Sequence, residues 1–179
     1  MTTEYSFSTN VDSIGSDQRG PRPAQCNLKE YWIGLEYIHA LNQEGQNNLR
    51  IDLERWNGQE GTVTYGNFDI GSEREQYRLN SLGKFENDGR QDLGDAFRGT
   101  GFGSQGYSQW DKEDTDHQNM AFSTYDRDND QYDEGNCARE DGSGWWFNRC
   151  SAANLNGKHY GKGSTALYRN KFVLFLDFK

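Results

Sequence analysis

Aliphatic residues and proline are scarce in this sequence. Val, Ile, Leu and Phe together number 30 of 179 residues, about 17%, and there are only two prolines. A fraction below roughly 20% in a charged chain is typical of disorder, yet 14% of the residues are aromatic, which disordered polar segments seldom show. We therefore expect a core built more from aromatic rings than from aliphatic side chains. The 21 glycines indicate many loops and argue against a helical bundle.

Basic residues and long apolar segments are also lacking. The chain has 19 Lys and Arg against 28 Asp and Glu, a net charge of −9. Nucleic-acid backbones are bound by clustered cations, so we expect no nucleic-acid partner. No apolar run approaches the roughly 18 residues of a transmembrane helix, so we expect no membrane span. Residues 1–20 show no secretory signal peptide.

Alternation of apolar and polar residues marks the clearest elements. Residues 48–56 alternate strictly, and residues 62–70 return as a second strand after Asn57-Gly58, a strong turn signal. The two segments predict an antiparallel hairpin, with Gly66 as a bulge. Residues 28–41 combine a short apolar run with helix-like spacing, which predicts a strand followed by a short helix.

The other segments are less regular. Residues 1–27 are polar and aperiodic, and we interpret them as a flexible lead-in. Residues 72–79 fit either a short capped helix or a strand. Residues 80–119 are rich in Gly, Asp and Gln and predict long ordered loops. Residues 171–179 have the alternation of a strand that closes a sheet.

Carboxylates are concentrated between residues 124 and 136 (TYDRDNDQYDEGN). Side chains this close repel one another unless a cation neutralises them, and oxygen ligands at this density suit Ca²⁺. The EF-hand pattern does not fit, because neither Asp126 nor Asp128 as first ligand brings Gly to position 6 and Glu to position 12. A calcium loop of another form and a solvated acidic loop both remain consistent with the sequence.

Cys137 and Cys150 enclose a 14-residue segment. A bridge between them would stabilise the fold by roughly 3 kcal/mol, and Cys26 would be left over as an odd thiol. A structural zinc site is disfavoured by the spacing. The adjacent Trp145 and Trp146 are either both core residues or one core residue and one pocket wall.

No arrangement of catalytic residues is recognisable. The histidines at positions 39, 117 and 159 lack a metal-ligand spacing, and there is no nucleophile motif. We interpret Asp114, Asp116 and His117 as ordinary loop residues. We therefore expect that this protein is not an enzyme.

Four segments closely resemble the fibrinogen C-terminal domain, a family that includes the fibrinogen β and γ chains, ficolins, tachylectins and angiopoietins. They are YWIGLEYIHAL (31–41), NLRIDLERWNG (48–58), FSTYDRDND (122–130) and GNCAREDGSGWWFNRCSAANLNG (135–157). The resemblance runs from about Leu28 to Tyr160, and it is most specific between residues 122 and 157.

The resemblance implies an α+β fold, with a small, twisted, mainly antiparallel sheet, short helices and long ordered calcium-binding loops. Residues 28–179 would form a partial domain behind a lead-in at 1–27, because the family's amino-terminal subdomain has no counterpart and the tail is atypical. Cys26 would then be a cysteine whose partner belongs to the missing subdomain. Residues 20–23 (GPRP) resemble the fibrin knob peptide, and also the start of such a domain.

A calcium site is also implied. Asp128 and Asp130 match the family residues that supply side-chain oxygens, and the backbone carbonyl of Tyr132 follows them. The last carbonyl comes from Glu134 or Gly135, because this loop is one residue longer than in γ-like chains.

The resemblance further implies a ligand pocket. Its members are Glu140, Asp141, Arg149, Cys150 and Ser151, beside a Cys137–Cys150 disulfide. Glu140 and Asp141 match positions that meet a basic peptide in the fibrinogen γ-type domain. In members that bind acetylated sugars, the peptide bond before the second cysteine is cis, and the amides that follow face the acetyl oxygen. Ser151 stands where the family usually has His.

We therefore expect an extracellular, secreted, calcium-dependent recognition module. Its ligand would be an acetylated glycan, as in innate-immune lectins, or a protein or peptide, as in fibrinogen. The alternative is a structural or inactive fragment of a fibrinogen-related protein, without a competent pocket. Because a missing subdomain would leave sheet edges and apolar surface open, we also expect self-association.

Overall fold

The computed structural model describes residues 5–8, 33–45, 47–55, 59–90, 93–100, 112–157 and 170–176. The fold is α+β, as predicted, with antiparallel sheets and short helices. Cys26, Tyr160 and the GPRP segment lie outside the described residues.

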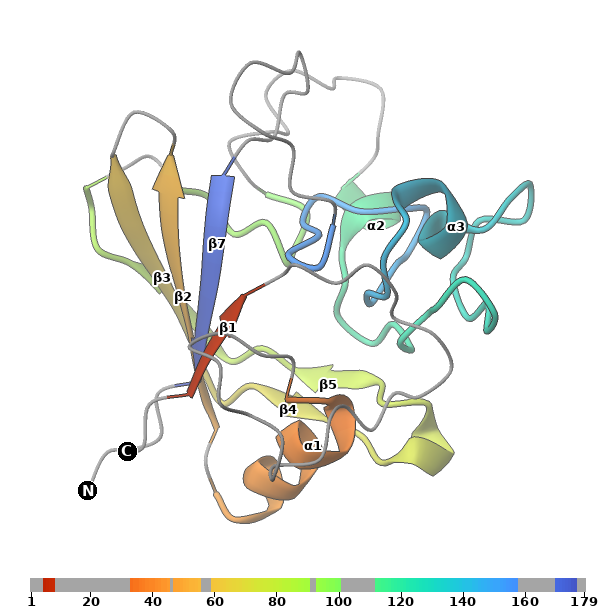
Figure 1. The fold of residues 1–179 in the computed structure, drawn as a ribbon, viewed down its shortest axis with the longest axis horizontal. Helices are drawn as coiled ribbons and strands as arrows, with labels where there is room; N and C mark the ends of the chain where they lie inside the picture. The colour runs from red at the N-terminus through yellow and green to blue at the C-terminus, as the bar shows by residue number, and fades with distance from the viewer. Residues whose placement is uncertain are drawn as a thin grey trace.

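A five-stranded antiparallel sheet occupies one side of the molecule (Figure 1). In spatial order its strands are β1 (Tyr5–Ser8), β7 (Asn170–Leu176), β2 (Asn48–Arg55), β3 (Glu60–Gly66) and β6 (Lys84–Asn87). β2 and β3 form the predicted hairpin, in which Ile51 is paired with Val63. The predicted turn at 57–58 lies outside the described residues. β7 pairs with both β1 and β2, so the strand predicted at 171–179 does close the sheet.

β1 lies within the segment that the sequence analysis assigns to an irregular lead-in. Tyr5 is paired with Leu176, and Phe7 with Leu174. Four residues are too few for alternation to be recognised in the sequence, and the partner strand lies at the other end of the chain. The pairing therefore depends on a tertiary contact that local pattern does not reveal.

A smaller sheet and a helix pack beside the large sheet (Figure 1). The helix α1 (Leu35–Gln43) follows Gly34, which has φ 87°, and it buries Leu35 and Ile38. The small sheet pairs β4 (Asp69–Ile70) with β5 (Leu79–Ser81). Buried Asn42 joins the two: its Nδ2 donates to the Phe68 carbonyl at 3.0 Å, and its Oδ1 accepts from the Ile70 amide at 3.1 Å.

Three local predictions need correction or refinement. The predicted bulge at Gly66 is wrong: β3 ends there, because Asn67 has φ 67° and turns the chain. Residues 72–79 contain the short 3₁₀ helix η2 (Glu73–Glu75), closed by a capping box, and then enter β5. Residues 80–119, predicted as loops, also contain β6 and the short helix α2 (Lys112–Thr115).

Aromatic rings make up a large part of the core, but the prediction that they outnumber the aliphatic side chains is wrong: among the described residues, eight aromatic residues and nine Leu, Ile or Val residues are buried. Trp145 and Trp146 are 2% and 3% exposed. The ring of Phe97 lies 5.3 Å from that of Trp145, and the ring of Phe122 lies 5.2 Å from that of Trp146, between centroids. Both tryptophans are therefore core residues, and the alternative in which one of them walls a pocket is wrong. Large rings suit this core because they bury much apolar area per residue.

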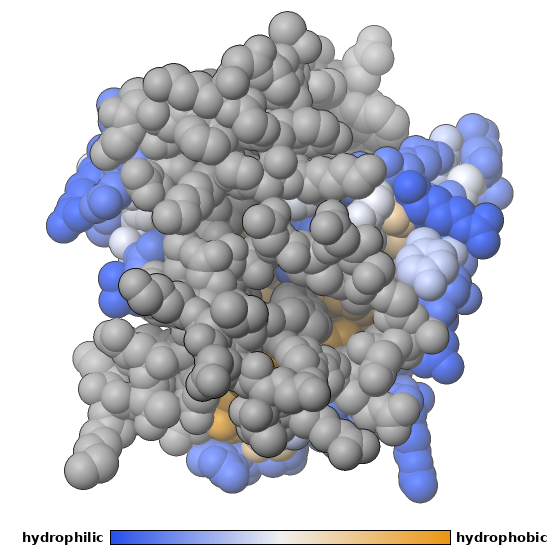
Figure 2. Space-filling view, in the orientation of Figure 1, coloured by the Kyte–Doolittle hydropathy of each residue, from blue (hydrophilic) through white to orange (hydrophobic). Residues whose placement is uncertain are grey.

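The surface around the acidic loop is hydrophilic. In Figure 2 the described residues at the right-hand edge, where α3 (Cys137–Asp141) lies in Figure 1, are coloured as hydrophilic. Across the described ranges, no helix has the length and apolar character needed to cross a bilayer.

Candidate functional site

The acidic loop begins on a small hairpin. Ser123 pairs with Trp145, and the Thr124 and Arg127 backbones bond to each other in both directions, at 2.9 and 3.1 Å. Asn129 then ties the loop back to the hairpin, since its Nδ2 donates to the Phe122 carbonyl at 2.7 Å. These bonds fix the direction in which the chain enters the carboxylate cluster.

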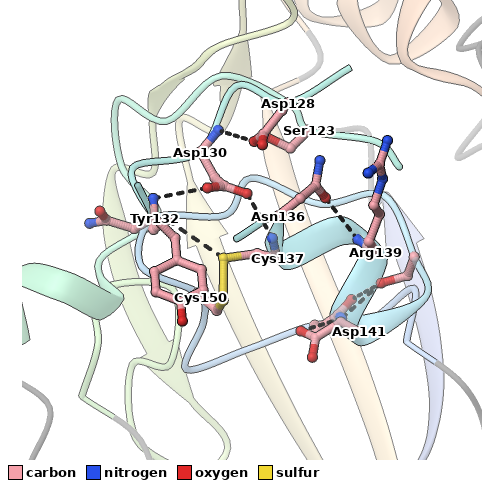
Figure 3. Close-up of a disulfide and its surroundings, with 12 residues drawn as sticks. Ser123, Asp128, Asp130, Tyr132, Asn136, Cys137, Arg139, Asp141 and Cys150 are labelled. Carbon is pink, nitrogen blue, oxygen red and sulfur yellow. Dashed lines mark hydrogen bonds between the residues drawn. A yellow bond between two sulfur atoms is a disulfide. The ribbon is translucent and has the colours of Figure 1, made fainter. Parts of the chain in front are cut away.

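Asp128 and Asp130 lie side by side in this loop (Figure 3). The Asp130 carboxylate accepts from the Tyr132 amide through Oδ1 and from the Cys137 amide through Oδ2, each at 2.9 Å. Burial raises the pKa of the Asp130 carboxyl, the charge of Asp128 raises it further, and the two N–H donors oppose the rise. Two adjacent carboxylates with this mutual repulsion are a place where a cation would be stabilised.

The candidate ligands of a cation in this loop are two carboxylates and neighbouring backbone oxygens. Within the described part of the chain, no three His, Cys, Asp or Glu side chains come together as a metal site. A calcium site here would combine Asp128 and Asp130 with backbone oxygens, for which Tyr132 and Glu134 are the predicted donors. The Tyr132 carbonyl already accepts from the Gly135 amide at 3.2 Å, and a carbonyl retains a second lone pair for a cation.

The helix α3 follows the acidic loop at once. Asn136 is its N-cap, and its side chain accepts from the Arg139 amide at 2.8 Å. Gly142 ends the helix in the left-handed conformation, with φ 65°. A disulfide joins Cys137, at the start of α3, to Cys150, as the resemblance implies (Figure 3). The acidic loop and the Cys150 segment are thus attached to the same short helix.

The segment at Cys150 is held by backbone and side-chain bonds. The Arg149–Cys150 peptide bond is cis, as the resemblance implies. The Arg149 amide donates to the Asp114 carbonyl at 2.9 Å, and Asn148 Nδ2 donates to the Asp116 carbonyl at 3.0 Å. The backbone oxygens of Asp114 and Asp116 thus hold this segment in place. The sequence analysis interpreted both as ordinary loop residues and did not predict this role.

Asp141, the last residue of α3, faces the segment that follows Cys150. Its Oδ2 accepts from Asn154 Nδ2 at 3.2 Å. Partial desolvation raises the pKa of the Asp141 carboxyl, and the charge of Glu140 raises it further. The Asn154 bond and the nearby Ser151 hydroxyl oppose this rise without cancelling it. Asp141, Glu140 and Arg149 are exposed as whole residues, so the predicted pocket residues present charge at the surface.

His117, predicted to be an ordinary loop residue, and Asn154 have roles in this region that the sequence did not indicate. His117 is fully buried, with Nδ1 2.7 Å from the Trp146 carbonyl oxygen and Nε2 3.2 Å from the Ala153 amide nitrogen. Burial lowers its pKa to about 4, and the bond to Trp146 only partly offsets this. Neutral His117 with its proton on Nδ1 satisfies both contacts. No spacing in the sequence signals this role, whereas Asn154 lies within the most specific matching block.

Comparison with known proteins places these features in a family. Residues 14–175 match the family model of the fibrinogen beta and gamma chains, C-terminal globular domain. The match includes part of the segment interpreted as a lead-in.

Fibrinogen chains are among the similar proteins. The fibrinogen gamma chain of Xenopus laevis is 46% identical over 137 residues, covering 75% of this chain and 30% of the relative. The human fibrinogen gamma chain is 44% identical over 137 residues, covering 75% of this chain and 28% of the relative. The chain thus spans less than a third of the length of these relatives.

Solved structures show the same fold. A lamprey fibrin D-dimer, in complex with the peptide Gly-His-Arg-Pro-amide, is 37% identical with a TM-score of 0.67, covering 83% of this chain and 50% of that chain. The fibrinogen-like globe domain of human ANGPTL6 is 28% identical with a TM-score of 0.66, covering 98% of this chain and 75% of that chain.

Proposed function

The chain belongs to the fibrinogen C-terminal domain family, a family of extracellular proteins, and we propose that it is a non-enzymatic recognition module that binds a cationic peptide segment at Asp141. The proposal concerns this segment alone, since the chain covers 30% of the Xenopus laevis fibrinogen gamma chain.

Asp141, which is exposed as a whole residue, carries the proposal. Asp141 lies at the end of α3, within reach of the segment that follows the Cys137–Cys150 disulfide. The lamprey relative is bound to a peptide that contains arginine. A guanidinium on a carboxylate forms paired, charge-assisted hydrogen bonds, so an anionic group at this position favours such a ligand.

Calcium belongs to the proposed function as a structural ion. Asp128 and Asp130 would hold it through their side chains, with backbone oxygens of Tyr132 and Glu134 completing the set. When bound, Ca²⁺ supplies charge that offsets the repulsion between the two carboxylates. Since Asp130 also accepts from the Cys137 amide, order in this loop is transmitted to the start of α3 and so to Asp141.

An extracellular location for this chain is likewise proposed. The Cys137–Cys150 disulfide supports it, because disulfides persist in oxidising compartments such as the extracellular space. The homologous fibrinogen chains are secreted proteins, and this also supports an extracellular location.

Isothermal titration of the full chain with Gly-His-Arg-Pro-amide, in calcium-containing buffer, tests the proposal. Asp141→Asn should weaken binding roughly 10- to 100-fold, since a hydrogen bond to a charged group contributes about 1.5–3 kcal/mol. Glu73→Gln is the matched control: it removes one exposed charge on η2, apart from α3 in Figure 1, and should leave affinity unchanged. Equal affinity of the parent and Asp141→Asn would refute the assignment.

N-Acetylglucosamine is the second probe, because the resemblance also implies acetylated ligands. Binding of this sugar without binding of the peptide would replace the peptide proposal with a lectin function. If the folded chain, loaded with calcium, binds neither probe, the inactive-fragment alternative is the correct one.

A further inference from the structure

A two-residue turn leads into the acidic loop. The Thr124 and Arg127 backbones bond to each other in both directions, at 2.9 and 3.1 Å, so Tyr125 and Asp126 form the tip of the turn. The Thr124 hydroxyl also donates to Asp126 Oδ1 at 2.7 Å. Asp128 follows directly after Arg127. The way in which this turn is held therefore determines where Asp128 lies.

The side chain of Arg139 holds the tip of this turn from α3. Its Nε donates to the Tyr125 carbonyl at 2.9 Å. The Arg139 amide donates to the side chain of Asn136, the N-cap of α3, at 2.8 Å. Figure 3 shows Asn136 and Arg139 at α3, beside the loop that carries Asp128 and Asp130. The turn is thus joined to the helix by a side chain whose own backbone is fixed.

The same helix holds the far end of the segment. The Cys137 amide donates to Asp130 Oδ2 at 2.9 Å, whereas Arg139 reaches Tyr125, which precedes Asp130 by five residues. Both donors belong to the first half of α3. A segment that is attached at both ends to one rigid element has few arrangements open to it. Asp128, which lies between the two attachments, is therefore held beside Asp130.

Arg139 makes this attachment without occupying the carboxylates. Among the described residues, Arg139 forms no ion pair with an Asp or Glu side chain, and its Nε is bonded to a carbonyl. A guanidinium on Asp128 or Asp130 would use the acceptor positions that a cation needs. A bond to the backbone orients the loop and leaves those positions open.

We propose that Arg139 is a positioning residue of the calcium site: its bond to the Tyr125 carbonyl holds the turn so that Asp128 and Asp130 are presented together to Ca²⁺. The inference rests on the calcium part of the proposed function and does not involve the peptide ligand. It adds a residue of α3 to a site whose expected ligands all belong to the acidic loop.

Two arginine variants with opposite expected effects test the proposal. Arg139→Met removes the donor, and titration of the full chain with CaCl₂ should show an affinity roughly two- to tenfold lower, the range expected when one hydrogen bond is lost. Loss of charge alone would act the other way, because a cation near the carboxylates repels Ca²⁺. Arg127→Met is the matched control: it removes an exposed cation of the same loop and should leave the affinity equal or higher.

Amide hydrogen exchange supplies a readout that needs no calcium. In the calcium-free chain, the Thr124 and Arg127 amides close the turn, and they should exchange faster in Arg139→Met than in the parent, by the same two- to tenfold. Amides of the β2–β3 hairpin should keep the parent's rate, because general destabilisation would speed exchange throughout the chain. The lower calcium affinity of Arg139→Met should also persist at 1 M NaCl, where the Debye length is about 3 Å and charge effects are screened.

The outcomes separate this inference from the function on which it rests. If the parent binds calcium and Arg139→Met binds it equally well or more tightly, the positioning role is refuted and the calcium site stands. Unchanged exchange of the Thr124 and Arg127 amides in Arg139→Met would refute the role as well. If the parent binds no calcium, the calcium part of the proposed function fails, and the inference fails with it.

Discussion

The imidazole of His117 connects the Trp146 carbonyl to the Ala153 amide, with Nδ1 2.7 Å from one and Nε2 3.2 Å from the other. A residue from the loop before the acidic hairpin thus holds together both sides of the disulfide region. Its ring also lies against the aromatic core, 5.7 Å from Phe97 and 6.1 Å from Trp145 between centroids.

Stability should fall at mildly acidic pH because of His117. The unfolded chain takes up a proton near the ordinary pKa of 6.5, whereas in the folded chain the pKa is lowered to about 4. The stabilisation from neutral His117 is therefore complete above pH 6.5 and is lost progressively as pH falls toward 4. The loss should reach ~3 kcal/mol over this window, and urea unfolding at a series of pH values measures it.

His117→Gln provides the comparison for this experiment. The variant should be less stable at pH 7.5, because the imidazole packing is lost, but its stability should change less between pH 6.5 and 4. Carboxylates elsewhere titrate in both proteins, so only the difference between the two curves reports His117. Parallel curves would contradict the assigned role.

The Cys137–Cys150 disulfide should contribute about 3 kcal/mol to the free energy of unfolding, the value expected for a closed loop near 15 residues. A double variant, Cys137→Ala with Cys150→Ala, should show this loss in denaturant unfolding. It should also weaken peptide binding, because α3 and the Ser151 segment are no longer joined covalently. The loop-entropy argument would be wrong if the double variant unfolded at the parent's midpoint.

Gly83 and Gly89 should respond differently to alanine. A Cβ at Gly83, with φ +52°, would lie 1.4 Å from the Gly66 carbonyl oxygen, whereas at Gly89, with φ +70°, it meets nothing within 4 Å. Gly89→Ala should cost only ~1 kcal/mol, from its left-handed conformation. Gly83→Ala must also move backbone at the end of β3 and should cost ~4 kcal/mol or more. Chemical denaturation of the pair separates the steric effect from the conformational one.

Calcium binding should depend on Asp128 and not on Asp133. Asp128→Asn removes a proposed ligand, whereas Asp133→Asn removes a neighbouring exposed carboxylate of the same loop. Titration with CaCl₂ should give binding for the parent and Asp133→Asn but not for Asp128→Asn. Calcium at 100 times its dissociation constant should stabilise the parent by ~2.7 kcal/mol. Loss of binding in both variants would indicate a diffuse charge effect without a defined site.

The elements that could be predicted are those whose burial leaves a local pattern. Leu49 and Ile51 alternate with charged residues, and both are buried on one face of β2. α1 was predictable for the same reason. β6 was not, because Lys84 and Glu86 face solvent and Phe85 alone gives no alternation. β1 depends on a partner more than 160 residues away and has no local signature.

In the candidate site, too, some features could be predicted from the sequence and others could not. The Cys137–Cys150 bridge, the acidic loop and Asp141 lie in one continuous block whose resemblance to the family is specific. His117 could not be found from the sequence, because its burial is produced by Phe97, Trp145 and Trp146 from other segments. The bonds of Asn154 to Asp141 and Ser143 likewise depend on two chain segments meeting across the disulfide.

The position of β7 between β1 and β2 has a consequence for how the chain is synthesised. Ribosomal synthesis delivers β2 and β3 early, and their hairpin can form from local contacts. The neighbour of β2 on its other side is the last described strand, so that edge waits until more than a hundred further residues have emerged. Such a high contact order slows folding and prolongs exposure of an unpaired strand. Yield during expression should therefore depend on chaperones that shield nascent strands.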